Sequence, residues 1–412
     1  MTWAPGPRPD WVAAVNSGAI WPMADAAAAP FTVEQVTAGA AATRGERPAD
    51  VRDRLGDETL EPLRILTDAL EAEARLTVLG RWITHRFLGR LVEQRLALDD
   101  YVRRDPGVVD EQIVEPWFVT GAPRTGTTVL HGVLAEDPRH RVPRGWELLF
   151  PAPPPADVED LSARITRADS ELRTPQVVAS GLTAIHEYSA QMPKECLSAM
   201  SLCMRSEEFV ARYHVPSYVT WLQSCDMTPA YAMHRLVLQV LQRRCPARRW
   251  VLKSPVHLHS LDALVDTYPD VRISFTHRDP LAVLASVTSL VATMRSAHSD
   301  HVDPEEIGRY HAELYSRSLD ALVDRDRTGS PAPGRTTHSR HDQFVGDAMA
   351  VVHHIYGRFG WDLPEPTAAR MAGYLAAQPQ AAPGEHRYDS DVVDLDVAQR
   401  RRLDRYQDRF LA

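Results

Sequence analysis

The chain has 412 residues, of which 44% are hydrophobic and 25% are charged, and its formal net charge is −9. This is the composition of an ordinary globular protein, and a net acidic chain argues against nucleic acid or an anionic membrane as the main partner. The four cysteines lack the spacing of a metal site and are expected to be reduced thiols, and the sequence contains no apparent metal-ligand cluster.

The N-terminal segment has no recognisable targeting signal. No basic stretch precedes an apolar core, so a signal peptide is not predicted. No apolar run approaches the roughly 20 residues that a transmembrane helix needs. We therefore expect a cytoplasmic protein without a membrane span. Residues 1–50 are rich in Ala, Pro and Gly and are predicted to wrap loosely on another part of the protein.

A helical pattern extends over residues 48–104. Leucines recur there at the spacing of one helix face, with charged residues between them, at Leu63, Leu66 and Leu70. Pro62 and Gly80 are the expected helix boundaries. Residues 1–112 are thus predicted to form a mainly helical segment that packs on the rest of the chain.

The pattern changes after Glu115, where the main domain (113–412) is expected to begin. Three short apolar runs predict buried strands at residues 117–120, 250–252 and 271–276. A helical pattern follows each of them, and Asp279-Pro280 is a good N-cap and first residue for the last helix. Residues 156–248 are predicted to be a helical insertion. Strands that alternate with helices predict an α/β fold, with a parallel sheet that is flanked by helices and binds ligands beyond the carboxyl ends of its strands.

A candidate anion-binding loop follows the first predicted strand. Residues 121–128 read GAPRTGTT. The glycines let backbone N–H groups turn towards an anion, and the N-terminus of the next helix adds its dipole. The spacing is nearly that of a Walker A loop, but Thr127 stands where the lysine should be, which argues against a nucleoside triphosphate. Arg124 is the cation that this loop offers instead.

A second candidate anion site follows the third predicted strand. Arg278 lies at the strand end, and Ser286 follows eight residues later, just over two helical turns along the next helix. A guanidinium and a hydroxyl on the same side are suited to grip a phosphate. An arginine at a helix start is often only a surface charge. The presence of a separate anion loop is what favours a binding site here.

These motifs resemble those of sulfotransferases that use 3′-phosphoadenosine-5′-phosphosulfate (PAPS). PRTGTT at residues 123–128 is similar to the 5′-phosphosulfate loop of that family, whose usual form is PKSGTT. Arg278 and Ser286 are similar to its 3′-phosphate pair. LKSPVH and then THRDP follow each other as in the bacterial branch, and GEHRY at residues 384–388 resembles an element expected to close over the 3′-phosphate. The resemblance covers roughly residues 115–390.

The resemblance implies a P-loop-type fold and in-line transfer of the sulfuryl group of PAPS to a hydroxyl, with 3′,5′-adenosine bisphosphate (PAP) as the product. It implies a donor site formed by Arg124, Thr125, Gly126, Thr127, Thr128, Arg278, Ser286, His386 and Arg387. The helical segment 1–112 is expected to pack on the acceptor side of the core or against a second subunit in a homodimer.

Three residues are predicted to be catalytic. Only two of the 46 basic residues are lysines, Lys194 and Lys253, and a lysine retained in such a chain is a candidate for a site that needs a compact ammonium. Lys253 and Arg124 are expected to stabilise charge on the bridging oxygen and the sulfuryl group. His257 is expected to be the general base, because imidazole titrates near neutrality and this residue follows a strand end.

The chain departs from the family pattern at two points. The usual loop lysine is Arg124, which can neutralise charge but cannot donate a proton to the leaving group at neutral pH. The histidine of the catalytic strand aligns with His257 only after a shift of about two residues, since Pro255 occupies the closest position. His186 is therefore the next candidate for the base.

The acceptor is not identified by the sequence. His186 and Glu195 are predicted to line its pocket, because the bacterial branch often has a histidine and a P-x-E segment in this region. Aromatic residues in the helical insertion could line an apolar pocket, although the core is the more favoured place for most of them. A small-molecule or lipid hydroxyl is the expected acceptor, and no metal is expected.

Two other functions remain open at this point. A P-loop kinase acting on a small molecule would share the loop, but the missing Walker lysine disfavours it. A nucleotide-binding scaffold without catalysis would keep the donor site and tolerate the change His257→Ala.

Overall fold

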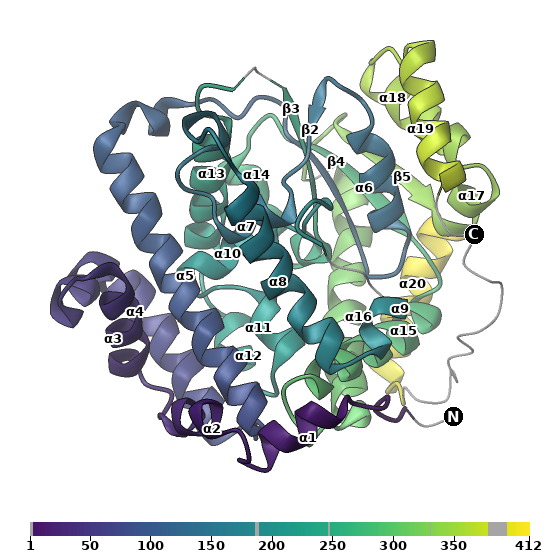
Figure 1. The fold of residues 1–412 in the computed structure, drawn as a ribbon. Coiled ribbons are helices and arrows are strands. Elements are labelled where there is room, and N and C mark those ends of the chain that lie inside the picture. The colour runs from purple at the N-terminus through teal and green to yellow at the C-terminus, as the bar shows by residue number, and fades with distance from the viewer. Residues whose placement is uncertain (1–2, 186–188, 246–247, 330, 378–393) are drawn as a thin grey trace.

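The computed structural model describes residues 3–185, 189–245, 248–329, 331–377 and 394–412. Within these residues, five strands form one parallel sheet at the centre of the molecule, in the order β2-β3-β1-β4-β5 (Figure 1). The strands are β1 (Trp117–Gly121), β2 (His140–Arg141), β3 (Arg249–Lys253), β4 (Arg272–His277) and β5 (Thr336–Arg340). The predicted α/β fold, with a parallel sheet flanked by helices, is confirmed.

The three strands that the sequence predicts form the middle of this sheet. β1 pairs with β3 on one side and with β4 on the other, so that Trp117 lies between Val251 and Arg272. Every residue of β1 is buried, which explains its continuous apolar run. β5 was not predicted, because its sequence TTHSR has no apolar run. Its pairing with β4, where Thr336 lies beside Ile273, makes it a strand.

Side chains of β1 alternate between two hydrophobic cores, one on each face of the sheet. Trp117 and Val119 pack in one core with residues of α6 (Thr127–Ala135) and α18 (Ala348–Phe359). Phe118 points the other way, into the larger core. The larger core contains residues of α13 (Thr228–Gln242), α14 (Leu261–Thr267), α15 (Pro280–Ser296) and α16 (Pro304–Thr328).

The N-terminal segment is helical and contributes to the larger core. Its helices are α1 (Asp10–Asn16), α2 (Trp21–Ala28), α3 (Val33–Arg44), α4 (Pro48–Ala72) and α5 (Val78–Arg104). Leu63, Leu66 and Leu70 of α4 belong to the same core as Phe118. The prediction of a loosely wrapped stretch over residues 1–50 is wrong for most of its length, because α1, α2 and α3 lie within it and bury apolar side chains.

One of the two predicted helix boundaries lies elsewhere. Pro62 sits inside α4, and the break in this helix is at Gly56, whose φ of 65° only glycine adopts readily. Gly80 lies in the first turn of α5, close to the predicted boundary. A Cβ atom there would stand 1.9 Å from the carbonyl oxygen of His298, so the glycine permits close backbone packing.

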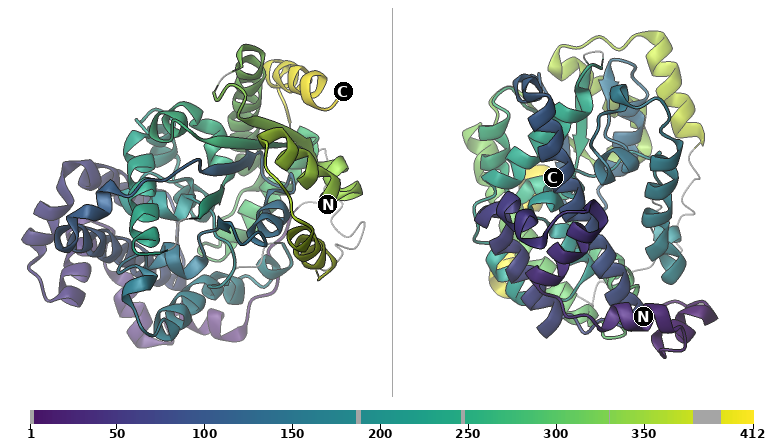
Figure 2. Two further views of the ribbon diagram at one scale, coloured as in Figure 1. Left: turned by 90° about the horizontal axis from the view of Figure 1, so that it is seen from above. Right: turned by 60° about the vertical axis from the view of Figure 1, so that its left-hand side comes forward.

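The segment between β2 and β3 is mainly helical, as Figures 1 and 2 show. Its helices within 156–248 are α8 (Ser162–Val178), α9 (Gly181–Ile185), α10 (Leu197–Met200), α11 (Glu207–Arg212), α12 (Pro216–Leu222) and α13. The α-helices not yet named are α7 (Gly145–Leu149), α17 (His341–Gly346), α19 (Glu365–Ala377) and α20 (Val397–Phe410). The short 3₁₀ helices are η1 (Pro106–Asp110), η2 (Pro155–Asp157), η3 (Ser201–Cys203) and η4 (Pro255–His259).

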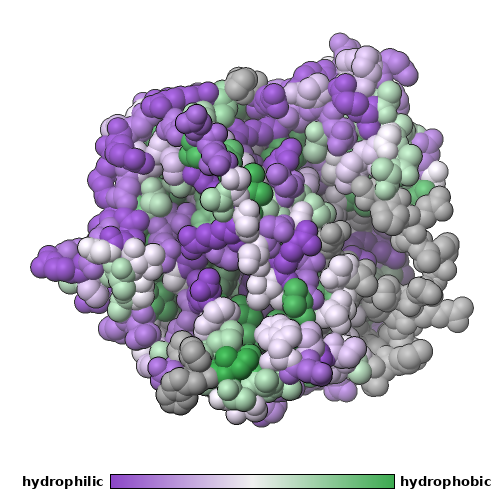
Figure 3. All heavy atoms as spheres, in the orientation of Figure 1, coloured by the Kyte–Doolittle hydropathy of each residue, from purple (hydrophilic) through white to green (hydrophobic). Residues whose placement is uncertain are grey.

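The described helices include none that is both long and apolar enough to cross a membrane. On the face shown in Figure 3, hydrophilic residues predominate, and the hydrophobic ones form small, separated patches.

Candidate active site

The segments that the sequence singled out meet at the carboxyl ends of three adjacent strands. β1 leads into the loop 121–128, β3 ends at Lys253, and β4 ends at His277, directly before Arg278. The chain leaves β1, which lies between β3 and β4, at a point where the strand order reverses. Such a switch point is where open parallel sheets bind ligands.

The loop after β1 has a backbone that only certain residues tolerate. Gly121 has a φ of 143°, and a Cβ atom there would lie 2.4 Å from the carbonyl oxygen of Thr276 on β4. Arg124 and Gly126 also have positive φ angles, of 65° and 93°. A non-glycine residue in this region carries strain that surrounding contacts must hold. The loop ends at the N-terminus of α6, which begins at Thr127 and leaves unpaired N–H groups for an anion.

The three threonines of the loop have different roles. Thr125 is buried, and its hydroxyl lies 2.8 Å from the carbonyl oxygen of Ala122 and 2.5 Å from the hydroxyl of Thr276. Its side chain therefore fastens the loop to β4, which leaves only its backbone for a ligand. Thr127 and Thr128 line the cavity described below.

Arg124, Arg278 and Ser286 are joined in one network. The Nη1 atom of Arg278 donates to the backbone carbonyl of Arg124 at 2.8 Å, and the Nε atom of Arg124 donates to the hydroxyl of Ser286 at 3.2 Å. The predicted second anion site thus lies against the first. Burial and then the Arg278 charge lower the pKa of His341 on α17 to about 4, as expected beside two arginines.

Lys253 links the loop to an acidic side chain. Its Nζ atom lies 2.5 Å from Oε1 of Glu195 and donates to the hydroxyl of Thr128 at 3.2 Å. The N–H of Cys196 donates to the backbone carbonyl of Lys253 at 3.1 Å, which holds the Glu195 segment against the end of β3. The hydroxyl of Ser254 lies 3.4 Å from the other carboxylate oxygen.

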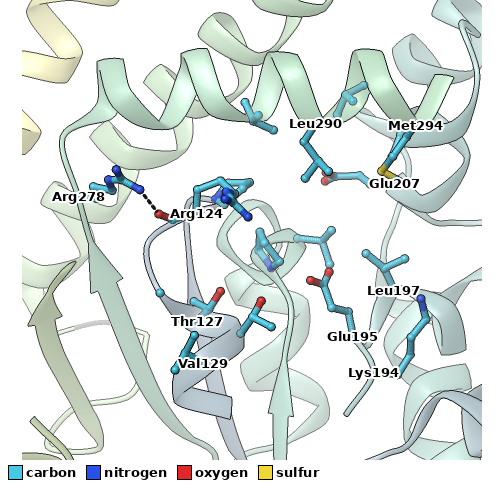
Figure 4. Close-up of a pocket in the computed structure, with 18 of the residues that line it drawn as sticks. Arg124, Thr127, Val129, Lys194, Glu195, Leu197, Glu207, Arg278, Leu290 and Met294 are labelled. Atoms are coloured by element: carbon cyan, nitrogen blue, oxygen red, sulfur yellow. Dashed lines mark hydrogen bonds between the residues drawn. The ribbon is translucent and has the colours of Figure 1, made fainter. Parts of the chain in front are cut away.

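Arg124, Thr128, Glu195 and Arg278 line one cavity of about 1050 Å³, whereas the buried Lys253, Ser254 and Ser286 lie behind its wall. Pockets for small molecules usually have about 300–1,000 Å³, so this cavity lies at the upper end of the usual range. Arg124, Arg278 and Thr127 lie on one side of it, and Glu207 lies on the other, near Met294 (Figure 4). Its wall away from the loop is largely apolar, with Leu172, Pro175, Leu182, Leu290, Val291 and Met294.

His257 does not line this cavity, although its neighbours Pro255 and Val256 do. Its side chain is fully buried in η4, where the ring lies edge-on to Phe118 at 4.8 Å and Nδ1 lies 2.9 Å from the hydroxyl of Tyr231. Burial lowers its pKa well below the ordinary value. The expected contact between His257 and an acceptor therefore needs correction: the 3₁₀ turn after Ser254 directs this side chain into the core.

Glu195 lines the cavity, as the sequence analysis expected, and so does Lys194. Both lysines of the chain thus lie at or beside this site. The predicted residues His186, His386 and Arg387 lie outside the described residues. Sequence reasoning missed Glu207, because two glutamates after Ser206 are also what an ordinary capped helix start would contain.

Comparison with known proteins decides the family. The model of the Sulfotransferase family matches residues 116–365, which is more than half of the chain. The chain belongs to the sulfotransferase family. The match includes the loop after β1, Lys253 and Arg278.

The sulfotransferase resembles mycobacterial members in both sequence and structure. It is 26% identical over 320 residues to omega-hydroxy-beta-dihydromenaquinone-9 sulfotransferase Stf3 of Mycobacterium bovis, covering 71% of this chain and 72% of that one. Its structure matches sulfotransferase STF1 of Mycobacterium tuberculosis with a TM-score of 0.75 and 30% identity, over 92% of this chain and 98% of that one. Sulfotransferase STF9 of Mycobacterium avium matches with a TM-score of 0.78 and 26% identity, over 92% and 96% of the two chains.

Proposed function

We propose that this sulfotransferase moves the sulfuryl group of PAPS to a hydroxyl group of an apolar small-molecule or lipid acceptor. One observation carries the proposal: two cation-bearing anion sites and a carboxylate share a single cavity whose remaining wall is largely apolar. A donor with a 5′-phosphosulfate and a 3′-phosphate needs two anion sites, and an acceptor hydroxyl needs a base between donor and acceptor.

The donor site consists of two parts. The N-terminus of α6, with Thr127, Thr128 and Arg124, binds the 5′-phosphosulfate. Arg278 binds the 3′-phosphate, and Ser286 supports it through Arg124. His386 and Arg387 remain predicted contacts to that phosphate.

Lys253 and Arg124 neutralise the charge that develops as the S–O bond to the phosphate breaks. Fixed cations aimed at developing charge act strongly in a cavity from which most water is excluded. The ammonium of Lys253 contacts both Thr128 of the loop and Glu195. It therefore links the proposed phosphate site to the proposed base.

Glu195 is the general base of the proposed reaction. The acceptor oxygen forms a bond to sulfur, the bond from sulfur to the phosphate oxygen breaks, and the hydroxyl proton passes to the Glu195 carboxylate. Glu195 lines the cavity and is held by Lys253 and Ser254, which is the orientation a base requires. The proton leaves the carboxyl to solvent after the product departs.

The acceptor is proposed to be a hydroxylated apolar compound or lipid. Apolar side chains of α8 and α15 face the cavity, and such walls favour apolar ligands through the surface they bury. The related Stf3 is named for a hydroxylated menaquinone derivative, which agrees with an acceptor of this class.

The donor assignment is tested by isothermal titration of the purified protein with PAP, with AMP and ATP as controls. We expect PAP to bind at least about tenfold more tightly than AMP, since the 3′-phosphate adds charge-assisted hydrogen bonds. Arg278→Ala should remove this preference. Equal affinity for PAP and AMP would overturn the proposal, and magnesium-dependent ATP hydrolysis would revive a kinase.

A further inference from the structure

A second group of polar side chains lines the cavity away from the phosphosulfate loop. Glu207 at the start of α11 and His311 and Tyr315 on α16 contribute to the wall there. Figure 4 shows Glu207 on the side opposite Arg278. None of the three has a role in binding PAPS or in the base function assigned to Glu195.

Two of these side chains, His311 and Tyr315, are buried and have polar atoms without a hydrogen-bond partner in the described residues, whereas Glu207 is 25% exposed. Tyr315 is 3% exposed, and its hydroxyl makes no hydrogen bond within the described part of the chain. His311 is 6% exposed, and its Nδ1 donates to the carbonyl of Ile307 at 2.7 Å. Its Nε2 atom therefore carries a lone pair, and no described residue donates to it. Both atoms belong to mostly buried side chains that line the cavity, and two such groups without a protein partner point to a ligand.

The contacts among these residues place them together. The rings of His311 and Tyr315 are stacked with centroids 6.0 Å apart. His259 of η4 lies 5.3 Å from Tyr315, ring to ring, and its Nε2 is 3.7 Å from Oε1 of Glu207. We call Glu207, His311 and Tyr315 the distal polar cluster, with His259 behind it.

The hydrogen bond to Ser318 determines which ring nitrogen of His259 carries the proton. The hydroxyl of Ser318 donates to the carbonyl of Leu314 at 2.9 Å, so it can only accept from Nδ1 of His259, 2.6 Å away. Nε2 of His259 thus carries a lone pair that faces the Glu207 carboxyl. A protonated carboxyl suits this arrangement, whereas a carboxylate would face a lone pair.

The surroundings of Glu207 agree with an uncharged carboxyl. Burial, and then the nearby Glu195, raise the pKa of Glu207 to about 7. Among the elements around it, η4 presents His259, and α16 presents Tyr310, His311 and Tyr315. Met294 of α15, His298 after that helix and Glu195 before α10 also line the cavity. Nε2 of His259 lies 3.7 Å from the Glu207 carboxyl, and burial lowers the pKa of His259 to about 3, so this imidazole supplies no positive charge to a carboxylate.

We propose that the distal polar cluster binds a second, uncharged hydroxyl group of the acceptor, separate from the hydroxyl that is sulfated. A hydroxyl both donates and accepts, so it satisfies the lone pair of His311 and the hydroxyl of Tyr315 or the carboxyl of Glu207 at once. The acceptor is then an apolar molecule with hydroxyl groups at two separated positions. This inference rests on the proposed function, because it assigns the far end of the same acceptor site.

The test measures binding to the PAP-loaded protein by isothermal titration. The probes are the alkane-α,ω-diols from hexanediol to tetradecanediol, each compared with the 1-alkanol of the same length. We expect one chain length at which the diol binds at least about fivefold more tightly than the alcohol, as one additional net hydrogen bond would produce. Chain length reports the distance between the two hydroxyl positions.

Variants test whether the preference for the diol over the alcohol depends on the distal polar cluster. Glu207→Leu and Tyr315→Phe should reduce the diol preference to a purely statistical ratio. That ratio arises because a diol can bind with either of its two equivalent ends. Glu207→Gln should retain the preference, because an amide also donates and accepts without charge. Tyr310→Phe is the matched control on α16, since the Tyr310 hydroxyl is not part of the cavity wall.

Three results would overturn the inference. They are the absence of a diol preference or of any probe binding, a preference that survives both Glu207→Leu and Tyr315→Phe, and tighter binding of an α,ω-amino alcohol than of the diol at every length. The last result would indicate an ammonium site. PAP binding is measured in every variant, so failure of the donor site is distinguished from failure of this inference.

Discussion

The Nζ atom of Lys253, at the end of β3, lies 2.5 Å from Oε1 of Glu195. The lysine side chain is 3% exposed and the glutamate side chain 23% exposed, so the ammonium is covered while the carboxylate reaches the cavity. Lys253 thus connects the proposed base to the loop that is proposed to bind the leaving phosphate. This ion pair is the basis of the first two predictions.

Glu195→Gln should lower kcat at least about 100-fold and leave PAP affinity unchanged, because the amide keeps the shape but cannot take a proton. His257→Ala is the matched comparison. It should keep kcat within about threefold and cost about 2–3 kcal/mol of unfolding free energy, since the ring fills a buried site. Steady-state kinetics and urea unfolding of both variants check this. The reverse pattern, with turnover lost only in His257→Ala, would restore the histidine as base.

Lys253→Met should also lower kcat at least about 100-fold, because it removes a buried cation at the leaving phosphate and leaves Glu195 without its ion-pair partner. PAP should bind more weakly as well, since PAP itself carries the charge. Lys253→Arg should recover part of the binding and little of the turnover, because a planar guanidinium cannot contact Thr128 and Glu195 in the same geometry. Full turnover in Lys253→Met would remove the lysine from the mechanism.

Gly126→Ala should weaken PAP binding about tenfold and cost roughly 1–2 kcal/mol of unfolding free energy, because a side chain at a φ of 93° is strained. Gly346→Ala is the control. No atom lies within 4 Å of its Cβ position and its φ is ordinary, so stability should change little or rise slightly. Titration with PAP and thermal unfolding compare the two. Equal behaviour would show that the loop backbone does not shape the donor site.

Glu207 should make the protein less stable as the pH rises. Its folded pKa of about 7 is above the ordinary value of 4.5, so between these values the folded state binds the proton more tightly than the unfolded state. The unfolding free energy therefore falls across this range, by on the order of 3 kcal/mol, and the whole cost is present above pH 7. Glu207→Gln lacks this titration.

The measurement compares urea unfolding of the wild type and Glu207→Gln at mildly acidic and mildly alkaline pH. The variant should gain stability relative to the wild type as the pH rises. A difference that stays constant with pH would mean that Glu207 titrates normally and is open to water. A difference of the opposite sign would mean that a cation holds the carboxylate.

The sequence determined the central strands and the donor motifs, because these depend on local patterns. An apolar run followed by GAPRTGTT specifies a buried strand, an anion loop and a helix start within twelve residues, 117–128. Lys253 and Arg278 were found in the same way, as charged residues at the ends of predicted strands. Residues at such ends meet at one edge of a parallel sheet whatever the rest of the chain does.

Which side chains face the cavity depends on packing between distant parts of the chain. His257 and Val256 are neighbours in η4, yet one enters the core and the other the cavity, since the direction of a side chain after a strand end depends on packing. β5 is polar and became a strand through pairing with β4. Glu195 and Lys253 are separated by 58 residues, and Glu207 meets α16 about 100 residues later, so their contacts exist only once the helical insertion has folded over the sheet.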